Sequence, residues 1–152
     1  MAIQFLDSRT SEFSNTSTGV GTLPVTPSIL LGDIGLQVAA VLATPNAADV
    51  RVELAGTIGV AGVAANTVTI TIERGGTGVS GSGVVIYTSV VDLYTGRNLI
   101  SFNAADFHPP VPLTGEIRYS MYAFNSGTPE PVITITGPVV FNGVAQAGTT
   151  TS

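Results

Sequence analysis

The side chains that could carry out catalysis are few. The chain of 152 residues has no cysteine, a single histidine, His108, and five cationic side chains that are all arginines. Nucleophilic catalysis needs a nucleophile beside a base, so a serine or threonine next to His108 is the pairing that could serve. His108 lies in a predicted loop, 107–110, directly before two prolines. A structural or solvent-exposed histidine is the simpler interpretation.

The acidic side chains offer a second kind of chemistry. Glu53 and Glu73 could lie on neighbouring strands and flank a cleft, as the two carboxylates of a glycosidase do. Each of them has an arginine close by in the sequence, Arg51 and Arg74 respectively. Ordinary cross-strand ion pairing on a solvated sheet face explains them better.

Metal and phosphate sites have little support in the sequence. A zinc site needs three or four histidine, cysteine or acidic ligands, and this chain does not supply a good set. Calcium accepts carboxylates in loops, but aspartate is also the commonest residue of turns. The glycine-rich stretch 75–83 does not match a Walker motif, and a flexible hairpin loop is the better interpretation. We therefore expect no enzymatic activity, no cofactor and no metal. The aspartates near predicted turns are Asp33, Asp49, Asp92 and Asp106.

The composition favours a protein that contacts other proteins. Only 10% of the residues are charged and the formal net charge is −5, whereas an ordinary domain has about 25% charged residues. A surface with so few charges repels its own copies weakly, although drift in composition is an alternative explanation. The acidic balance argues against nucleic acid as a partner. We also expect no membrane partner, because no run of 18 apolar residues is present.

The residues from 28 to 147 carry the pattern of an all-β domain. The clearest alternation places Val68, Ile70 and Ile72 on one face, with threonines between them, as a half-buried strand requires. Glycine, proline and asparagine separate eight such segments, which predicts an eight-stranded jelly-roll sandwich. An immunoglobulin-like sandwich is the alternative. The predicted strands are 28–31, 34–43, 49–60, 67–73, 84–91, 98–103, 116–124 and 132–141.

The first 27 residues differ from this body. Residues 1–27 are mostly small and polar, which is typical of a linker, and residues 148–152 form a polar tail. The arm begins with an isolated apolar cluster of Ile3, Phe5 and Leu6. A disordered tail is one interpretation. The other is that the arm adds a strand to a neighbouring copy, because about twenty extended residues span roughly 60 Å.

The pattern of the sequence resembles that of the surface proteins of Bacillus-type endospores. The resemblance covers the body, with alternating segments such as 67–72 and 132–136, and the arm segment 3–7. One branch comprises the exosporium glycoproteins, whose terminal domains resemble the jelly roll of tumour necrosis factor and form trimers. The other comprises endospore appendage fibre subunits, in which an N-terminal connector joins subunit layers. This chain has neither the collagen repeat of the first branch nor cysteines for disulfide cross-links between subunits.

Together these features predict a structural protein that assembles with copies of itself. We expect trimeric layers that pack through an apolar sheet face and are joined into a fibre by the arm, with Ile3, Phe5 and Leu6 as its plug. The resemblance implies a spore-surface or extracellular location, reached without a secretory signal peptide, and other spore-surface proteins as possible partners. The alternative is a trimeric receptor- or glycan-binding head of a phage or spore fibre. That alternative predicts a solvated groove at one end of the sandwich, lined by Tyr87, Tyr94, Tyr119 or Tyr122, or by phenylalanine.

Overall fold

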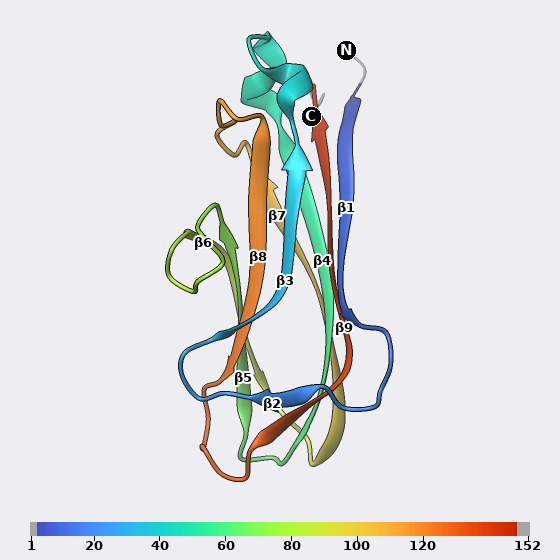
Figure 1. The fold of residues 1–152 in the computed structure, drawn as a ribbon, viewed down its shortest axis with the longest axis vertical. Helices are drawn as coiled ribbons and strands as arrows, with labels where there is room; N and C mark the ends of the chain where they lie inside the picture. Colours follow the sequence, from blue (N-terminus) through green and yellow to red (C-terminus); the bar gives the residue numbers. More distant parts are fainter. Residues whose placement is uncertain (1–2, 149–152) are drawn as a thin grey trace.

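The computed structural model describes residues 3–148 as a sandwich of two antiparallel sheets (Figure 1). Nine strands and two short 3₁₀ helices make up the described chain. The strands are β1 (Gln4–Ser14), β2 (Gly21–Leu23), β3 (Ile29–Gln37), β4 (Arg51–Gly62), β5 (Thr67–Arg74), β6 (Val84–Asp92), β7 (Gly96–Phe107), β8 (Glu116–Asn125) and β9 (Ile133–Ala147); the helices are η1 (Ala39–Val41) and η2 (Pro45–Asp49).

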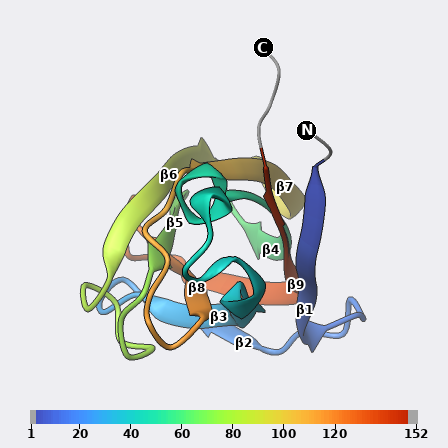
Figure 2. The ribbon, with the colours of Figure 1, turned by 90° about the horizontal axis from the view of Figure 1, so that it is seen from above.

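The order of the strands confirms the predicted jelly roll. Sheet 1 has the order β1-β9-β4-β7, with β2 also paired to β9, and sheet 2 has the order β3-β8-β5-β6. The first long strand thus pairs with the last, β3 with β8, β4 with β7 and β5 with β6. This nested pairing is that of one long hairpin wrapped into two sheets. Figure 2 shows the two sheets curving around a common interior.

The number of strands is nine rather than the predicted eight. The segments 28–31 and 34–43, predicted as two strands, form the single strand β3 followed by η1. The sequence suggested a turn at Gly32, but the strand continues there through a break in register. Gly32 is required for packing instead, because a Cβ at this position would lie 2.5 Å from the Cβ of Phe141 in the opposite sheet.

The predicted arm, 1–27, is not a free extension in the described chain. Residues 4–14 form β1 and residues 21–23 form β2, and both pair with β9. The expected boundary between arm and domain at residue 28 therefore does not match the fold. The physical reason is that β9 would otherwise leave one long edge unpaired, and β1 supplies the partner that the jelly-roll order needs.

The core lies between the two sheets and follows the predicted alternation. Val68, Ile70 and Ile72 of β5 are fully buried. Strand β8 contributes Tyr119 and Met121, and β9 contributes Phe141; all three are among the largest fully buried side chains. Apolar burial of this kind, worth about 25 cal/mol for each Å² removed from water, is the main force that holds the sandwich together.

A polar contact joins the two sheets near one edge of this core. The Asp106 carboxylate of β7 accepts hydrogen bonds from Arg74 Nη1 of β5 at 2.6 Å and from the Tyr119 hydroxyl of β8 at 2.9 Å. Burial raises the pKa of Tyr119, and the adjacent Asp106 charge raises it further. Tyr119 therefore remains protonated at neutral pH and donates this hydrogen bond.

The outer face of sheet 2 is partly covered by the loop 75–83. The buried carboxylate of Glu73 accepts hydrogen bonds from the backbone N–H groups of Gly81 and Gly83, both at 2.8 Å. The Arg118 guanidinium donates to the Gly76 carbonyl at 3.2 Å. Glu73 therefore anchors the glycine-rich loop and does not pair with Arg74 on a solvated face.

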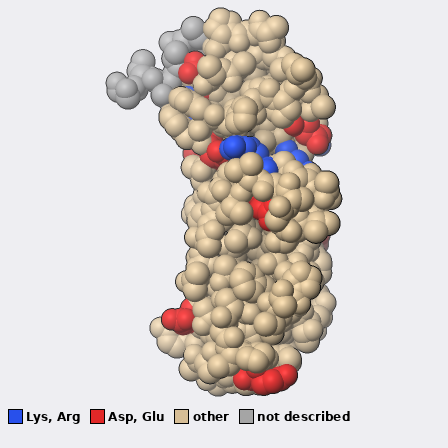
Figure 3. Space-filling view, turned by 90° about the vertical axis from the view of Figure 1, so that its left-hand side faces the viewer, with Lys and Arg blue, Asp and Glu red and all other residues tan. Residues whose placement is uncertain are grey.

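On the side shown in Figure 3, charged side chains gather mainly in one belt.

We expect the Asp106 contact to be a large contributor to stability. Asp106→Ala leaves Arg74 without its buried partner and should lower the free energy of unfolding by about 3 kcal/mol. Tyr119→Phe removes one hydrogen bond to a charged group and should cost about 1.5 kcal/mol. Urea denaturation measures both changes. Glu130→Ala, at an exposed position, is the control with an expected loss under about 0.5 kcal/mol. An equal loss for Glu130→Ala and Asp106→Ala would contradict this role.

Candidate functional site

The structure separates the three residues that the sequence singled out as the plug. Ile3 and Phe5 are 55% and 63% exposed, whereas Leu6 is half-buried and packs against the core. Phe5 lies opposite Gln146 of β9, and the register shifts immediately after it. In the described chain, Phe5 and Leu6 therefore belong to a strand that pairs with the same chain, and Ile3 directly precedes that strand.

The backbone of β1 is well paired, but its side chains are weakly anchored. Nine residues of β1 have register partners on β9. The positions that point toward the other sheet carry polar residues. Asp7 Oδ2 accepts from the Gln37 N–H at 2.8 Å, and Ser11 Oγ accepts from the Asp33 N–H at 3.2 Å. Because Leu6 is the main apolar contact of β1 with the core, backbone and polar hydrogen bonds hold this strand.

The pKa of the Asp7 carboxyl is lowered from its ordinary value of 3.8. Partial burial alone would raise this pKa, but hydrogen bonds from the Arg9 side chain and from the backbone N–H groups of Gln37 and Ser8 favour the charged form. A pKa that is lower in the folded state stabilises the fold above the unfolded value. That stabilisation is lost as the pH falls through the folded value.

The connection after β1 is held mainly by side-chain contacts. Among the described residues, the backbone groups of 15–18 form no hydrogen bond with other backbone groups, whereas Gly19 and Val20 already bond to β9. The Arg97 guanidinium donates to the Ser17 carbonyl at 3.4 Å, and the Thr16 carbonyl packs against Gly137. Hydroxyl contacts of Ser14 with Thr16, at 3.2–3.4 Å, organise part of this segment. A short polar segment of this kind can serve as a hinge between β1 and the rest of the sandwich.

A second candidate surface is the outer face of sheet 1. Cross-strand rows of small and uncharged side chains run over it, with few charges among them. The rows read, from β1 through β9 and β4 to β7, Ser8–Val144–Glu53–Ala105, Thr10–Asn142–Ala55–Asn103 and Glu12–Val140–Thr57–Ser101. Because Ala55 of β4 lies between the longer side chains of Asn142 and Asn103, the face is hollowed at this row.

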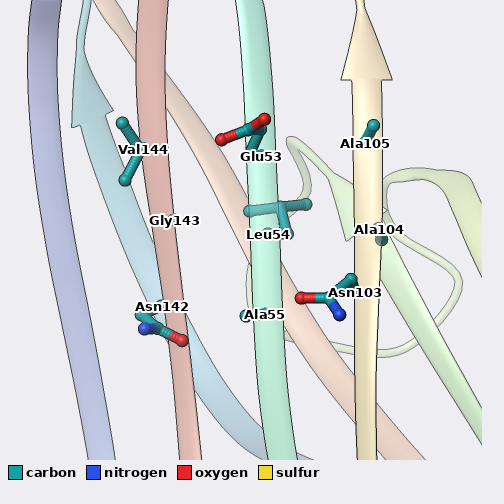
Figure 4. Close-up of a pocket in the computed structure, with 9 residues that line it drawn as sticks. All are labelled: Glu53, Leu54, Ala55, Asn103, Ala104, Ala105, Asn142, Gly143 and Val144. Carbon is teal, nitrogen blue, oxygen red and sulfur yellow. The ribbon is translucent and has the colours of Figure 1, made fainter.

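This hollow is a groove of about 520 Å³ (Figure 4). Asn103 and Asn142 lie on either side of Ala55, and Glu53 lies one row further along β4. Within residues 3–148 the side chains of these three polar residues form no hydrogen bond. Amides both donate and accept, so the groove can bind an uncharged polar group or a second protein surface. It holds no nucleophile beside a base.

The structure does not bring the other candidate chemical residues together. His108 lies in an exposed loop with φ of 57°, and its ring stacks on Phe107 with centroids 3.9 Å apart. Among the described residues no group of three or more histidine, aspartate or glutamate side chains could hold a metal ion. Asp33 is bonded to Arg118, and Asp106 belongs to the contact between the sheets.

The four tyrosines do not form a common platform. Tyr119 and Tyr122 are buried, and Tyr87 stacks on Phe102 with ring centroids 5.3 Å apart. Tyr94 is exposed by itself after β6. The groove lies on the face of sheet 1 rather than at one end of the sandwich, and its lining contains no aromatic residue. No helix in the part of the chain that the structure describes is long and apolar enough to cross a membrane.

The groove residues were missed in the sequence. Asn103 and Asn142 come from strands that are far apart in the chain and meet only through the pairing of β4 with β7 and β9. The available signal was modest: both amides occupy outward positions of strands whose neighbouring residues are apolar or small. The order of the strands in space, which brings them together, is not readable from local alternation.

Comparisons with known proteins gave structural likenesses alone. No family model and no curated protein matches the chain. The VP2 subviral particle of infectious bursal disease virus matches 93% of this chain at 14% identity with a TM-score of 0.49, and the chain spans 39% of that protein. Particles of the same virus with T=1 symmetry match 94% of it at 16% identity, with a TM-score of 0.49 and 36% of the viral chain covered.

A sugar-binding protein also appears among the solved structures. The C-terminal domain of EclA matches 90% of this chain and is itself covered over 78%, at 6% identity and a TM-score of 0.33. All these TM-scores are below 0.5. The assignment as a jelly roll therefore rests on the strand order described above, and these likenesses do not indicate the function of the chain.

We expect acidification to loosen β1 before the rest of the sandwich. As the pH falls below 3.8 and through the lowered pKa of Asp7, protonation of this carboxylate weakens its hydrogen bond to the Gln37 N–H, so hydrogen exchange at Gln37 should rise relative to exchange at Ile70. Nuclear magnetic resonance, with correction for the intrinsic exchange rate, measures both amides. Asp7→Asn, which cannot titrate, should lose this pH dependence. The same pH dependence in both proteins would rule out Asp7 as its source.

Proposed function

We propose that this protein is a structural subunit that assembles with copies of itself by exchanging β1. In this assembly β1 of one copy pairs with β9 of the next, so that each copy both donates and receives a strand. The observation that supports it is the contrast within β1: nine of its residues pair with β9, but the side chains that point toward the sandwich are mostly polar. The side chains of such a strand contribute little stabilisation that depends on pairing with its own chain rather than with another copy.

The exchange costs little because it replaces each contact by an identical one. Domain swapping of this kind is a low-cost route between copies, and a head-to-tail exchange that does not close into a ring propagates as a filament. Residues 15–18 provide the hinge. The exposed Ile3 and Phe5 then lie where the layers meet and can pack against the neighbouring copy.

The low charge of the surface supports close packing between copies. The chain has 15 charged side chains, five basic and ten acidic, and the rows on the outer face of sheet 1 are mostly small and neutral. We propose this face as the contact within a layer. The resemblance to spore-surface proteins suggests three copies per layer and a location on the spore surface or otherwise outside the cell.

Paired cysteines test the exchange directly, because the natural chain has none. Ser8 lies opposite Val144 across β1 and β9, and directly opposed strand positions place Cβ atoms within about 5 Å, close to the range of a disulfide. Oxidation of assembled Ser8→Cys/Val144→Cys protein should give a ladder of covalent multimers on a denaturing gel without reductant.

The matched control is Thr57→Cys/Ser101→Cys, which joins β4 to β7 within one sheet. Both of these strands remain in their own chain, so this pair should close within single chains and migrate as a monomer. Monomers alone from the Ser8/Val144 pair, in samples whose fibres are visible by electron microscopy, would exclude strand exchange.

A second candidate function rests on the unpaired polar side chains of the groove. We propose as the alternative that Asn103, Asn142 and Glu53 bind a neutral oligosaccharide, whose hydroxyls match amide and carboxylate groups and whose ring can rest on Ala55. The aromatic residues expected for such a site are absent from the groove lining, so recognition in this alternative depends on hydrogen bonds.

Titration with cellohexaose, maltohexaose and N-acetylchitohexaose, followed by nuclear magnetic resonance, tests this alternative. Binding of one of these sugars should weaken at least about tenfold in Ala55→Leu, which fills the groove floor, a loss of about 1.4 kcal/mol. Thr10→Leu, in the same row but outside the groove lining, should bind normally. The alternative is abandoned if none of the three sugars shifts the resonances of the wild-type groove.

A further inference from the structure

We infer that β6 is a second assembly edge, which pairs antiparallel with β6 of another copy and joins two molecules through sheet 2. This contact lies on the opposite side of the sandwich from β1 and does not require strand exchange. Strand β6 is the last strand of sheet 2 and pairs with β5 alone among the described strands. Its second edge therefore presents backbone N–H and C=O groups that have no strand partner.

Two of the sandwich's edge strands are protected against such pairing. Strand β1 carries Asp7, Arg9 and Glu12 and has two breaks in its register with β9. On β3, the N–H groups of Asp33 and Gln37 already donate to side chains of β1. Charges, register breaks and capped backbone groups are the usual means by which natural proteins block edge-to-edge association.

Strand β6 has fewer of these protections, because its one register shift with β5 lies before Tyr87 and its pairing is regular from Tyr87 to Val91. It contains no charged residue and no proline over that length, and Val84, Val85 and Val90 are 57%, 54% and 64% exposed. The first charge comes at Asp92, and it already accepts a hydrogen bond from Thr67 Oγ1 at 3.0 Å. The edge strand of sheet 1 on the same side, β7, has Arg97 near its start and Asp106 near its end.

The sequence of β6 fits a second copy of itself. The register shift between β5 and β6 lies before Tyr87, so the stretch from Tyr87 to Asp92 pairs regularly with β5. A two-fold axis through Val90 places this exposed valine opposite its own copy and Thr88 opposite Asp92. The Thr88 hydroxyl can then donate to the carboxylate, and like charges do not oppose each other.

Pairing of this kind adds backbone hydrogen bonds and buries valine side chains that water otherwise contacts. Strand addition at a sheet edge draws its affinity from main-chain hydrogen bonds and its register from the side chains. A single pair of short strands contributes modestly. Repetition along a fibre of linked copies would raise the overall strength through effective concentration.

Val90→Lys tests the contact because it introduces the kind of charge that protects other edges, at a position where the side chain is exposed. If copies also exchange β1, the wild type should form double filaments, and Val90→Lys should halve the mass per unit length measured by scanning transmission electron microscopy. If they do not exchange β1, the wild type should be a dimer and Val90→Lys a monomer by light scattering. Val132→Lys, at an exposed valine beside β9, should change neither quantity.

A single cysteine checks the register. Because Val90 lies at the proposed axis, Val90→Cys should form a disulfide between two copies under mild oxidation, whereas Val132→Cys should remain largely reduced. An unchanged mass in Val90→Lys would overturn the inference, whatever the outcome for β1. A reduced mass without a Val90→Cys dimer would retain the edge but overturn the proposed register.

Discussion

The pairing of β9 with its neighbours is the constraint on which the rest of the structure depends. This strand of 15 residues bonds to β4 along one edge and to both β1 and β2 along the other. Two glycines make this possible. A Cβ at Gly59 would collide with the Gly137 carbonyl, and a Cβ at Gly137 would collide with the Thr16 carbonyl. At Gly137, where φ is 74°, β9 passes from β1 as its partner to β2.

This arrangement accounts for the unusual character of β1. Its outward residues extend the neutral face of sheet 1, and its inward residues cap the edge of β3 rather than fill the core. The strand therefore closes the sandwich without contributing much apolar burial. The other long strands supply the buried apolar side chains of the core. The hydrogen bonds to Asp106 join the two sheets near β7. A domain built in this way can retain its interior while its first strand changes partner.

The sequence predicted the parts of the fold that depend on local alternation. Val68, Ile70 and Ile72 were placed correctly, because a strand with one buried face shows a period of two. The same reasoning failed at Gly32, where a glycine needed for close packing resembled a turn, and at β1, where polar inward residues resembled a linker. The groove could not be predicted, because Asn103 and Asn142 become neighbours only through the order of the strands. The candidate catalytic and metal-binding residues do not lie close together in the structure. Their separation likewise follows from the order of the strands in space.

The pairing of Gln4 with Ala147 has a consequence for how the chain reaches this state. It joins residues from nearly opposite ends of the described sequence, and the entropy lost in closing a loop grows with the length of the loop. Contacts of such large sequence separation slow folding, so β1 is expected to dock late, after the core has formed. During that interval β9 can accept the first strand of any nearby molecule. The concentration at which the chains fold thus becomes a kinetic determinant of whether each molecule closes on itself or links to another.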